Sequence, residues 1–170
     1  REQTNKYYAN DQDLLEDIVA GYGAFIKQVY AAGCRNLQLD DCSWGVLVDP
    51  RAELFFGADQ EGLKRIKALL LEINNRVLDA APADLTINTH VCRGNFHSTW
   101  ACEGGYDDVA DALLAQEHVN AFFLEFDDHR SGGFEPLASV PAGKKVVLGL
   151  ITTKHAQLEE KAKVIERIHE

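Results

Sequence analysis

The pair His90-x-Cys92 is the part of this sequence whose residue types and spacing point most directly to chemistry. It closes an alternating apolar run over residues 85–92, and residues i and i+2 of a strand point to the same face of a sheet. An imidazole and a thiolate side by side form a mixed donor set that suits zinc. The spacing therefore predicts a metal site. The alternative for so short a pattern is a histidine and a cysteine that simply pack in the core.

Further reactive side chains follow the other apolar runs of the chain. Asp40 and Asp41 end one run, Glu125 lies at the end of a second, and Lys154 follows a third. Because the carboxyl ends of parallel strands meet at one edge of a sheet, we expect these side chains to gather near His90. Such gathering predicts one functional site built from several strand ends.

Each of these residues also has a structural interpretation. The two aspartates can terminate a strand and form a turn, and Glu125 can pair with Arg130 at a surface turn. The charged residues 127–130 are typical of a solvated turn. Cys42 and Cys102 lie on the functional side of the predicted sheet and are alternative metal ligands.

The elements that must position these residues alternate between helix and strand. Apolar residues recur with the 3.6-residue period of a helix in four segments and alternate or cluster as in strands in four others. The predicted helices span about residues 11–32, 59–80, 107–117 and 156–168. The predicted strands span residues 36–40, 85–92, 121–126 and 146–151.

This alternation predicts an α/β fold with a parallel sheet, of the (β/α)8 TIM-barrel type. A full barrel uses about 250 residues, so 170 residues with four strands correspond to roughly half a barrel. An open half exposes two strand edges, so we expect it to form a homo-oligomer or to be part of a longer chain. The alternative fold is a small open doubly wound parallel sheet.

Composition excludes several classes of protein. The chain is 46% hydrophobic and 26% charged, as in ordinary globular domains, and its length suits one domain. Its net charge of −10 and its lack of a dense basic cluster argue against nucleic acid as a partner. No apolar run approaches the roughly 20 residues that span a bilayer, so we expect no membrane contact and a cytoplasmic location.

The cysteines and the first residues carry two further expectations. The four cysteines are irregularly spaced in a chain long enough to fold without cross-links, so we expect reduced thiols. The sequence contains no methionine, which predicts that Arg1 is not the native first residue.

Four motifs at the predicted strand ends resemble the C-terminal catalytic barrel of the cobalamin-independent methionine synthase family, in particular its short bacterial branch. The resemblance extends from about Leu14 to the end of the chain, and its most specific part is the segment around His90. The motifs, in order, are Gln38-Leu39-Asp40-Asp41, His90-Val91-Cys92-Arg93-Gly94-Asn95-Phe96-His97-Ser98-Thr99-Trp100, Phe123-Leu124-Glu125-Phe126-Asp127 and Gly149-Leu150-Ile151-Thr152.

The resemblance implies a site that binds zinc and homocysteine. In that family the zinc ligands correspond to His90, Cys92 and Glu125, and a fourth ligand, a cysteine on a later strand, has no counterpart here. The aspartate that contacts the amino group of homocysteine corresponds to Asp40. The chain is then one partial domain over residues 1–170, a portion of the barrel that lacks its last strand.

The implied activity is a zinc-dependent methyl transfer from a methylfolate-type donor to the thiol of homocysteine, which belongs to methionine biosynthesis. Where the longer enzymes carry Asp-x-His, this chain has Thr152-Thr153-Lys154, so Lys154, or His155 beside it, is the candidate proton donor for the departing amine. The alternatives are alkyl transfer to another thiol, or an incomplete, non-catalytic fragment that binds metal weakly and self-associates.

Overall fold

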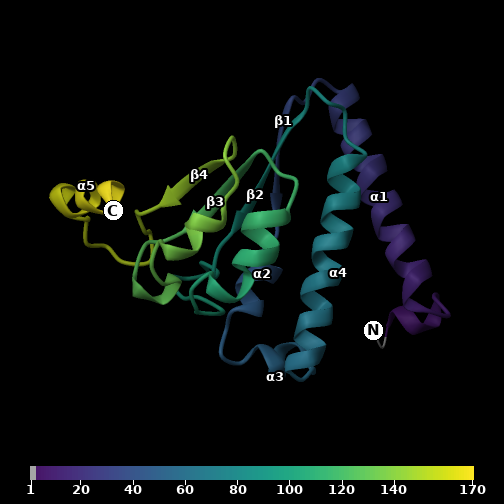
Figure 1. The fold of residues 1–170 in the computed structure, drawn as a ribbon, viewed down its shortest axis with the longest axis horizontal. Coiled ribbons are helices and arrows are strands. Elements are labelled where there is room, and N and C mark those ends of the chain that lie inside the picture. The colour runs from purple at the N-terminus through teal and green to yellow at the C-terminus, as the bar shows by residue number, and fades with distance from the viewer. Residues whose placement is uncertain (1–2) are drawn as a thin grey trace.

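A computed structural model describes residues 3–170 as an α/β fold around a four-stranded parallel sheet (Figure 1). The strands lie side by side in the order of the sequence. They are β1 (Asn36–Asp40), β2 (Thr86–Val91), β3 (Ala121–Glu125) and β4 (Lys145–Gly149). The prediction of four parallel strands with helices is confirmed, and β1 has the predicted bounds. An open sheet of this kind is compatible with the doubly wound alternative, and a closed barrel is not shown.

Five α-helices connect or flank the strands: α1 (Asp11–Ala31), α2 (Ser43–Leu47), α3 (Ala52–Phe56), α4 (Gln60–Asp79) and α5 (Lys161–His169). Short 3-10 turns lie at Thr4–Lys6, His129–Ser131 and Glu135–Ser139. The two long helices begin where the sequence predicts, because the side chains of Asn10 and Asp59 accept hydrogen bonds from the first turns of α1 and α4.

Two predicted helices differ from the structure. The segment predicted as a helix over 107–117 is a 3-10 turn, Asp107–Val109, followed by a π-helical turn, Ala110–Leu114. The last helix begins at Lys161 and not near residue 156, because a loop precedes it in which the Thr152 N–H donates to the Glu159 carboxylate at 2.8 Å.

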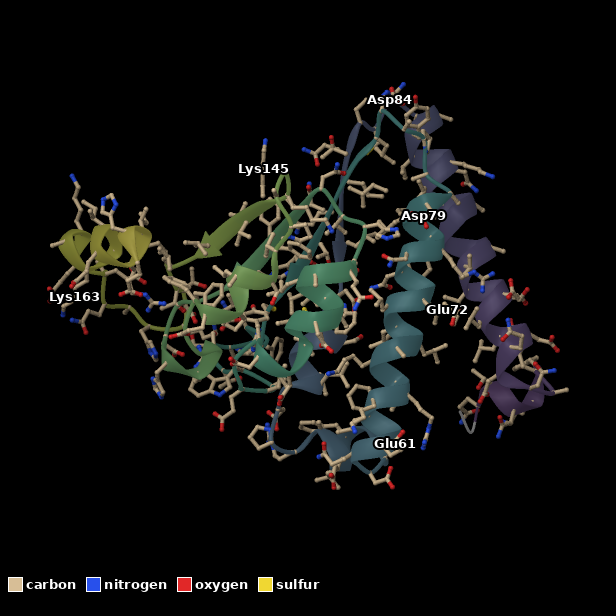
Figure 2. The ribbon with its side chains drawn as sticks, viewed as in Figure 1. Glu61, Glu72, Asp79, Asp84, Lys145 and Lys163 are labelled. Atoms are coloured by element: carbon tan, nitrogen blue, oxygen red, sulfur yellow. The ribbon has the colours of Figure 1, made fainter. Side chains whose placement is uncertain are left out.

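The helices α1 and α4 pack against each other beside the sheet (Figure 1). Arg76 of α4 donates to the carboxylate of Glu16 on α1 at 3.0 Å, and the Tyr30 hydroxyl donates to Asp84 at 2.6 Å at the other end of the pair. Figure 2 shows acidic side chains such as Glu61 and Glu72 along α4. The helix is therefore amphipathic, as the sequence predicts.

One face of the sheet carries the core. Alternate strand residues point to this face and are almost fully buried, among them Ile87, Val91, Phe122 and Leu124. Trp44 of α2 packs into the same cluster with no exposed surface. Burial of side chains of this size contributes about 1.5–3 kcal/mol each. This packing holds the carboxyl ends of β1, β2 and β3 in fixed positions.

The opposite face of the sheet is exposed on both edge strands, β1 and β4. Asn36, Gln38 and Asp40 of β1 are exposed, and so is Val147 of β4. Within the sheet that the structure describes, β1 pairs with β2 alone and β4 with β3 alone. No helix within residues 3–170 combines the length and apolar character needed to cross a membrane.

Candidate metal site

Cys42, His90 and Cys92 come together at the carboxyl ends of β1 and β2. Asp40 of β1 pairs with His90 of β2 in the strand register. Two residues after each of them the backbone reaches a cysteine, Cys42 after β1 and Cys92 after β2. The potential ligand atoms of the three residues all lie within 4.8 Å of one another, and the two sulfur atoms are 3.4 Å apart. We call these three residues the Cys/His cluster. Their arrangement can hold a metal ion.

The backbone around the cluster is tightly packed. Gly45, in the first turn of α2, lies so close to the Cys92 carbonyl oxygen that an added Cβ would approach it to 2.4 Å. Glycine at this position therefore lets α2 pack directly on the chain after β2. This close approach brings Cys42, immediately before α2, beside Cys92.

Hydrogen bonds orient the His90 ring and the Cys92 sulfur. The Asp40 carboxylate lies 2.6 Å from His90 Nδ1, so Nε2 is the ring nitrogen that remains for Cys92 or for a metal. The Gly94 N–H donates to Cys92 Sγ at 3.4 Å. A carboxylate on the second nitrogen of a histidine is the usual outer partner of a metal-binding imidazole.

The close contacts also shift the pKa values of the three groups. The hydrogen bond to Cys92, reinforced by that to Asp40, raises the pKa of His90 to about 9. Hydrogen bonds from Cys42 and then from His90 lower the pKa of Cys92, whereas the contact with Cys92 raises the pKa of Cys42. These opposite pKa shifts favour Cys42 as the donor and Cys92 as the acceptor in the contact between the two sulfur atoms. A divalent cation would take the place of the protons that these groups share.

Glu125, predicted as a metal ligand, lies at the end of β3 in a different environment. Its carboxylate is 8% exposed, and it accepts hydrogen bonds from the Arg93 N–H at 2.7 Å, from Lys154 at 3.2 Å and from Arg130 at 3.3 Å. Asp127 pairs with the same two cations, at 2.9 Å and 3.3 Å. We call Glu125, Asp127, Arg130 and Lys154 the ion-pair cluster.

The structure corrects the interpretation of this segment as a solvated surface turn. Glu125 does pair with Arg130, but the side chains of Arg130 and Asp127 are each 4% exposed. The guanidinium also stacks on the Trp100 ring, 4.1 Å from its centroid. Burial alone would raise the pKa of Asp127, but the Lys154 ammonium outweighs it and lowers the pKa of that carboxyl. The turn is therefore a packed, charge-compensated element.

Residues of both clusters line a cavity of about 390 Å³. They are His90 and Cys92 of the Cys/His cluster and Glu125, Asp127 and Lys154 of the ion-pair cluster, and Phe123 lines the cavity as well. The volume lies in the range of small-molecule sites. Because both clusters face this cavity, one bound molecule can contact both.

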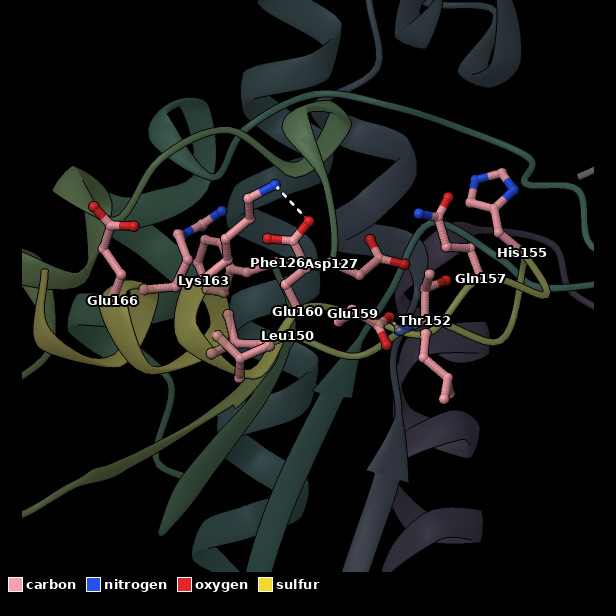
Figure 3. A pocket seen from close by; sticks show the side chains of 13 residues that line it. Phe126, Asp127, Leu150, Thr152, His155, Gln157, Glu159, Glu160, Lys163 and Glu166 are labelled. Atoms are coloured by element: carbon pink, nitrogen blue, oxygen red, sulfur yellow. Dashed lines mark hydrogen bonds and ion pairs between the residues drawn. The ribbon is translucent and has the colours of Figure 1, made fainter.

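A second cavity of about 510 Å³ lies between α5 and the loops after β3 and β4 (Figure 3). Phe126, Leu150 and His155 are among the residues that line it. An ion pair also joins two of its lining residues, Lys163 and Glu160, at 3.3 Å. Asp127 lines both cavities. His155, which the sequence analysis names as a candidate proton donor in place of Lys154, lies in the wall of this second cavity.

The sequence predictions for the site are met to different degrees. His90 and Cys92 come together as their spacing predicts, and Asp40 lies against His90. Cys42, considered as an alternative ligand, completes the group, whereas Cys102 is buried and donates to the Arg93 carbonyl oxygen at 3.7 Å. Cys42 could be ranked above Cys102 because it follows β1 as Cys92 follows β2, in the strand register.

The chain is similar to two longer bacterial proteins. It is 44% identical over 167 residues to the uncharacterized protein YxjH of Bacillus subtilis strain 168, and 42% identical over 168 residues to the uncharacterized protein YxjG of the same organism. Each match covers 96% of this chain and 44% of the relative. The chain thus spans less than half the length of these curated relatives. No protein-family model and no solved structure matches it.

Proposed function

We propose that this chain carries the metal-binding part of a zinc-dependent methyltransferase that methylates the thiol of homocysteine with a methylfolate-type donor. The observation that carries the proposal is the Cys/His cluster at the ends of two adjacent parallel strands, facing a cavity of small-molecule size. The motifs of the cobalamin-independent methionine synthase family include His90 and Cys92, so the resemblance and the geometry point to the same residues.

Zinc fits the donor set. Two thiolates on one tetrahedral zinc, each at about 2.3 Å, lie about 3.8 Å apart. The 3.4 Å between the sulfur atoms of Cys42 and Cys92 needs little adjustment to reach that spacing. Thiolate and imidazole donors favour zinc over magnesium or calcium, which prefer oxygen. Three protein donors are also the number that catalytic zinc sites use, which leaves one position for a substrate.

The chain's own residues would prepare the site for a thiol. Bound zinc deprotonates a coordinated thiol and so makes it a nucleophile at neutral pH. Asp40 holds the imidazole of His90 through Nδ1. Its side chain remains 75% exposed, so it is also accessible to the ammonium group of an amino-acid substrate.

The ion-pair cluster bears on two of the predicted roles. Burial would lower the pKa of Lys154, but Asp127 and Glu125 outweigh it and raise that pKa. Lys154 therefore keeps its proton at neutral pH, and its predicted role as a proton donor requires these ion pairs to open. Glu125 as a metal ligand stays a prediction, because its carboxylate would have to exchange Lys154 for the metal.

We further infer that the fold is part of a (β/α)8 barrel. The strand order β1-β2-β3-β4 proceeds in one direction, whereas a doubly wound sheet reverses at a switch point. Right-handed crossovers in one direction place the connecting helices on a single face. The open opposite face then corresponds to a barrel interior, which the remaining residues of a longer chain or a second copy would complete.

The experiment is metal analysis followed by an activity assay. We expect the purified chain to bind close to one zinc per chain, with loss of binding in His90→Ala and Cys92→Ser and retention in the control Cys34→Ser. Methionine formation from homocysteine and a methylfolate, measured with the zinc-loaded chain and with a version extended to the length of its relatives, tests the reaction. Methyl transfer that persists undiminished in Cys92→Ser would refute the mechanism.

A further inference from the structure

The sulfur atoms of Cys42 and Cys92 form a pair that differs from the other thiols of the chain. They lie 3.4 Å apart, although 50 residues separate them in the sequence. Cys34 instead donates to the Asn36 carbonyl oxygen at 3.3 Å, and Cys102 is buried against the Arg93 carbonyl oxygen. Cys42 and Cys92 are therefore the one thiol pair that the described residues place in contact.

The backbone geometry allows these two sulfur atoms to bond. Asp40 and His90 are paired across β1 and β2, and the Asp41 N–H still donates to the His90 carbonyl oxygen at 3.0 Å. Continued for two residue pairs beyond Asp40 and His90, this register sets residue 42 opposite residue 92. Neighbouring strands lie about 4.8 Å apart, and disulfide-linked Cα atoms are usually about 4.4–6.8 Å apart. Closing the S–S bond to about 2.05 Å requires the sulfur atoms to approach by about 1.4 Å, which side-chain rotation can supply.

A small oxidant can reach this pair. Both residues are partly exposed, and Cys92 lines the 390 Å³ cavity. The Gly94 N–H donates to Cys92 Sγ, and the His90 side chain adjoins it, so negative charge on this sulfur is supported from two sides. Because a thiolate is the reactive form of cysteine, Cys92 is suited to react first and Cys42 to resolve the product.

We propose that Cys42 and Cys92 form a reversible disulfide when the metal-free chain meets hydrogen peroxide. The Cys92 thiolate attacks one peroxide oxygen, the O–O bond breaks, and Cys92 becomes a sulfenic acid while hydroxide leaves and takes up a proton as water. The Cys42 sulfur then attacks the Cys92 sulfur, the S–S bond forms, and the S–O bond breaks to release a second water. Two thiols lose two electrons and two protons, and one peroxide becomes two waters.

The disulfide and the metal exclude each other. A disulfide removes two of the three donors of the Cys/His cluster, and only His90 remains. Conversely, a metal held by both thiolates withholds their electron pairs from the peroxide. The disulfide itself rests on geometry alone, whereas its coupling to metal rests on the metal site proposed above. The pair would then act as a redox control on metal loading.

The first test uses the metal-free chain, reduced, freed of metal with a chelator and treated with one equivalent of hydrogen peroxide. We expect the intact mass to fall by two hydrogen atoms, peptide mapping to join Cys42 to Cys92, and dithiothreitol to reverse both changes. Cys34→Ser should behave like the parent, whereas Cys42→Ser should instead gain oxygen on Cys92. Circular dichroism before treatment checks that each variant is folded. A different pairing, or independent oxidation of the two thiols in the parent chain, would overturn the inference.

The second test repeats the oxidation after addition of one equivalent of zinc. We expect zinc to slow disulfide formation at least tenfold, and we expect the oxidised chain to bind no zinc until it is reduced. Equal oxidation rates with and without zinc would overturn the coupling and count against the proposed metal site. Absence of the disulfide in the metal-free chain would instead overturn the redox pair and leave the metal site standing.

Discussion

The two clusters that face the 390 Å³ cavity differ in how their charges are compensated. In the ion-pair cluster, buried carboxylates share two buried cations, Arg130 and Lys154. In the Cys/His cluster, the donor groups contact one another and one exposed carboxylate, Asp40. The charges of the first cluster are compensated by side chains of the chain itself, whereas the sulfur and nitrogen donors of the second lie within 4.8 Å of one another, and no buried cation of the described residues pairs with them. The second cluster can therefore hold a metal ion.

This difference explains why the structure groups Cys42, and not Glu125, with His90 and Cys92. The carboxylate of Glu125 already accepts three hydrogen bonds, two of them from cations. Hydrogen bonds to charged groups contribute about 1.5–3 kcal/mol each, so moving this carboxylate to a metal has a substantial cost. The Cys42 sulfur, in contrast, contacts Cys92, a member of the same cluster, and among the described residues it forms no ion pair that a metal would have to displace.

Removal of one cation from the ion-pair cluster should give the largest effect. We expect Lys154→Met to lower the free energy of unfolding by about 3–5 kcal/mol, because Glu125 and Asp127 then share one buried cation. Urea denaturation measures this change. Lys145→Met, at the exposed start of β4, is the matched control and should change stability little. Equal stability of the two variants would show that the ion-pair cluster is solvated and weak.

Replacement of the carboxylate that orients His90 should have a smaller effect, and this effect is on the affinity for zinc. Asp40→Asn should weaken zinc binding about ten- to hundredfold, as loss of an outer partner of a metal-binding histidine does. Competition with a chelator measures the affinity. The side chain of the neighbouring Asp41 accepts a hydrogen bond from Asn74 and does not contact the His90 ring, so Asp41→Asn should leave zinc binding unchanged. If both variants bind zinc as the parent does, Asp40 is free for the substrate role that the family resemblance implies.

The pH dependence of stability extends the comparison with the ion-pair cluster to Glu117. This carboxyl is also buried, but the side chain that donates to it is the amide of Asn74 and not a cation. Burial raises the pKa of Glu117 to about 8, although Asn74 donates to it at 2.8 Å. Between its ordinary pKa and about 8, the folded chain holds a proton that the unfolded chain has lost. The stability that this bound proton contributes is therefore complete below the ordinary pKa of the carboxyl, and it is lost as pH rises through this window.

We expect Glu117→Gln to be progressively more stable than the parent as pH rises from 5 to 8, by at most about 1.4 kcal/mol per pH unit. Denaturation at several pH values measures the difference. The exposed Glu72→Gln should show no such trend. Parallel pH profiles for Glu117→Gln and the parent chain would mean that the Glu117 carboxyl is compensated after all.

Local patterns in the sequence predict much of this fold. The alternation over residues 36–40 gives β1 its bounds, and side-chain capping by Asn10 and Asp59 fixes the starts of the long helices. The approach of His90 to Cys92 follows from their spacing of two residues. All these features depend on residues close together in the chain, which is why a single sequence reveals them.

Features that depend on distant residues could not be predicted in the same way. The sequence predicts that Glu125 and Lys154 lie at the same edge of the sheet, but not that they form an ion pair, because 29 residues separate them and no periodic pattern links the two. The short helices α2 and α3 have five residues each, too few for a helical period to show. Cys42 was recognisable as a candidate by its position after β1. Its selection over Cys102 required the strand register and the close packing at Gly45.

The measurement that tests the central claim most directly is the binding of cobalt(II) and zinc to Cys42→Ser and Glu125→Gln, compared with the parent chain. If Cys42, His90 and Cys92 hold the metal, Cys42→Ser should lose one thiolate's share of the sulfur-to-cobalt charge-transfer absorption and bind zinc far more weakly. Glu125→Gln should keep the full absorption and one zinc per chain. Full absorption in Cys42→Ser, with loss of metal in Glu125→Gln, would contradict this assignment.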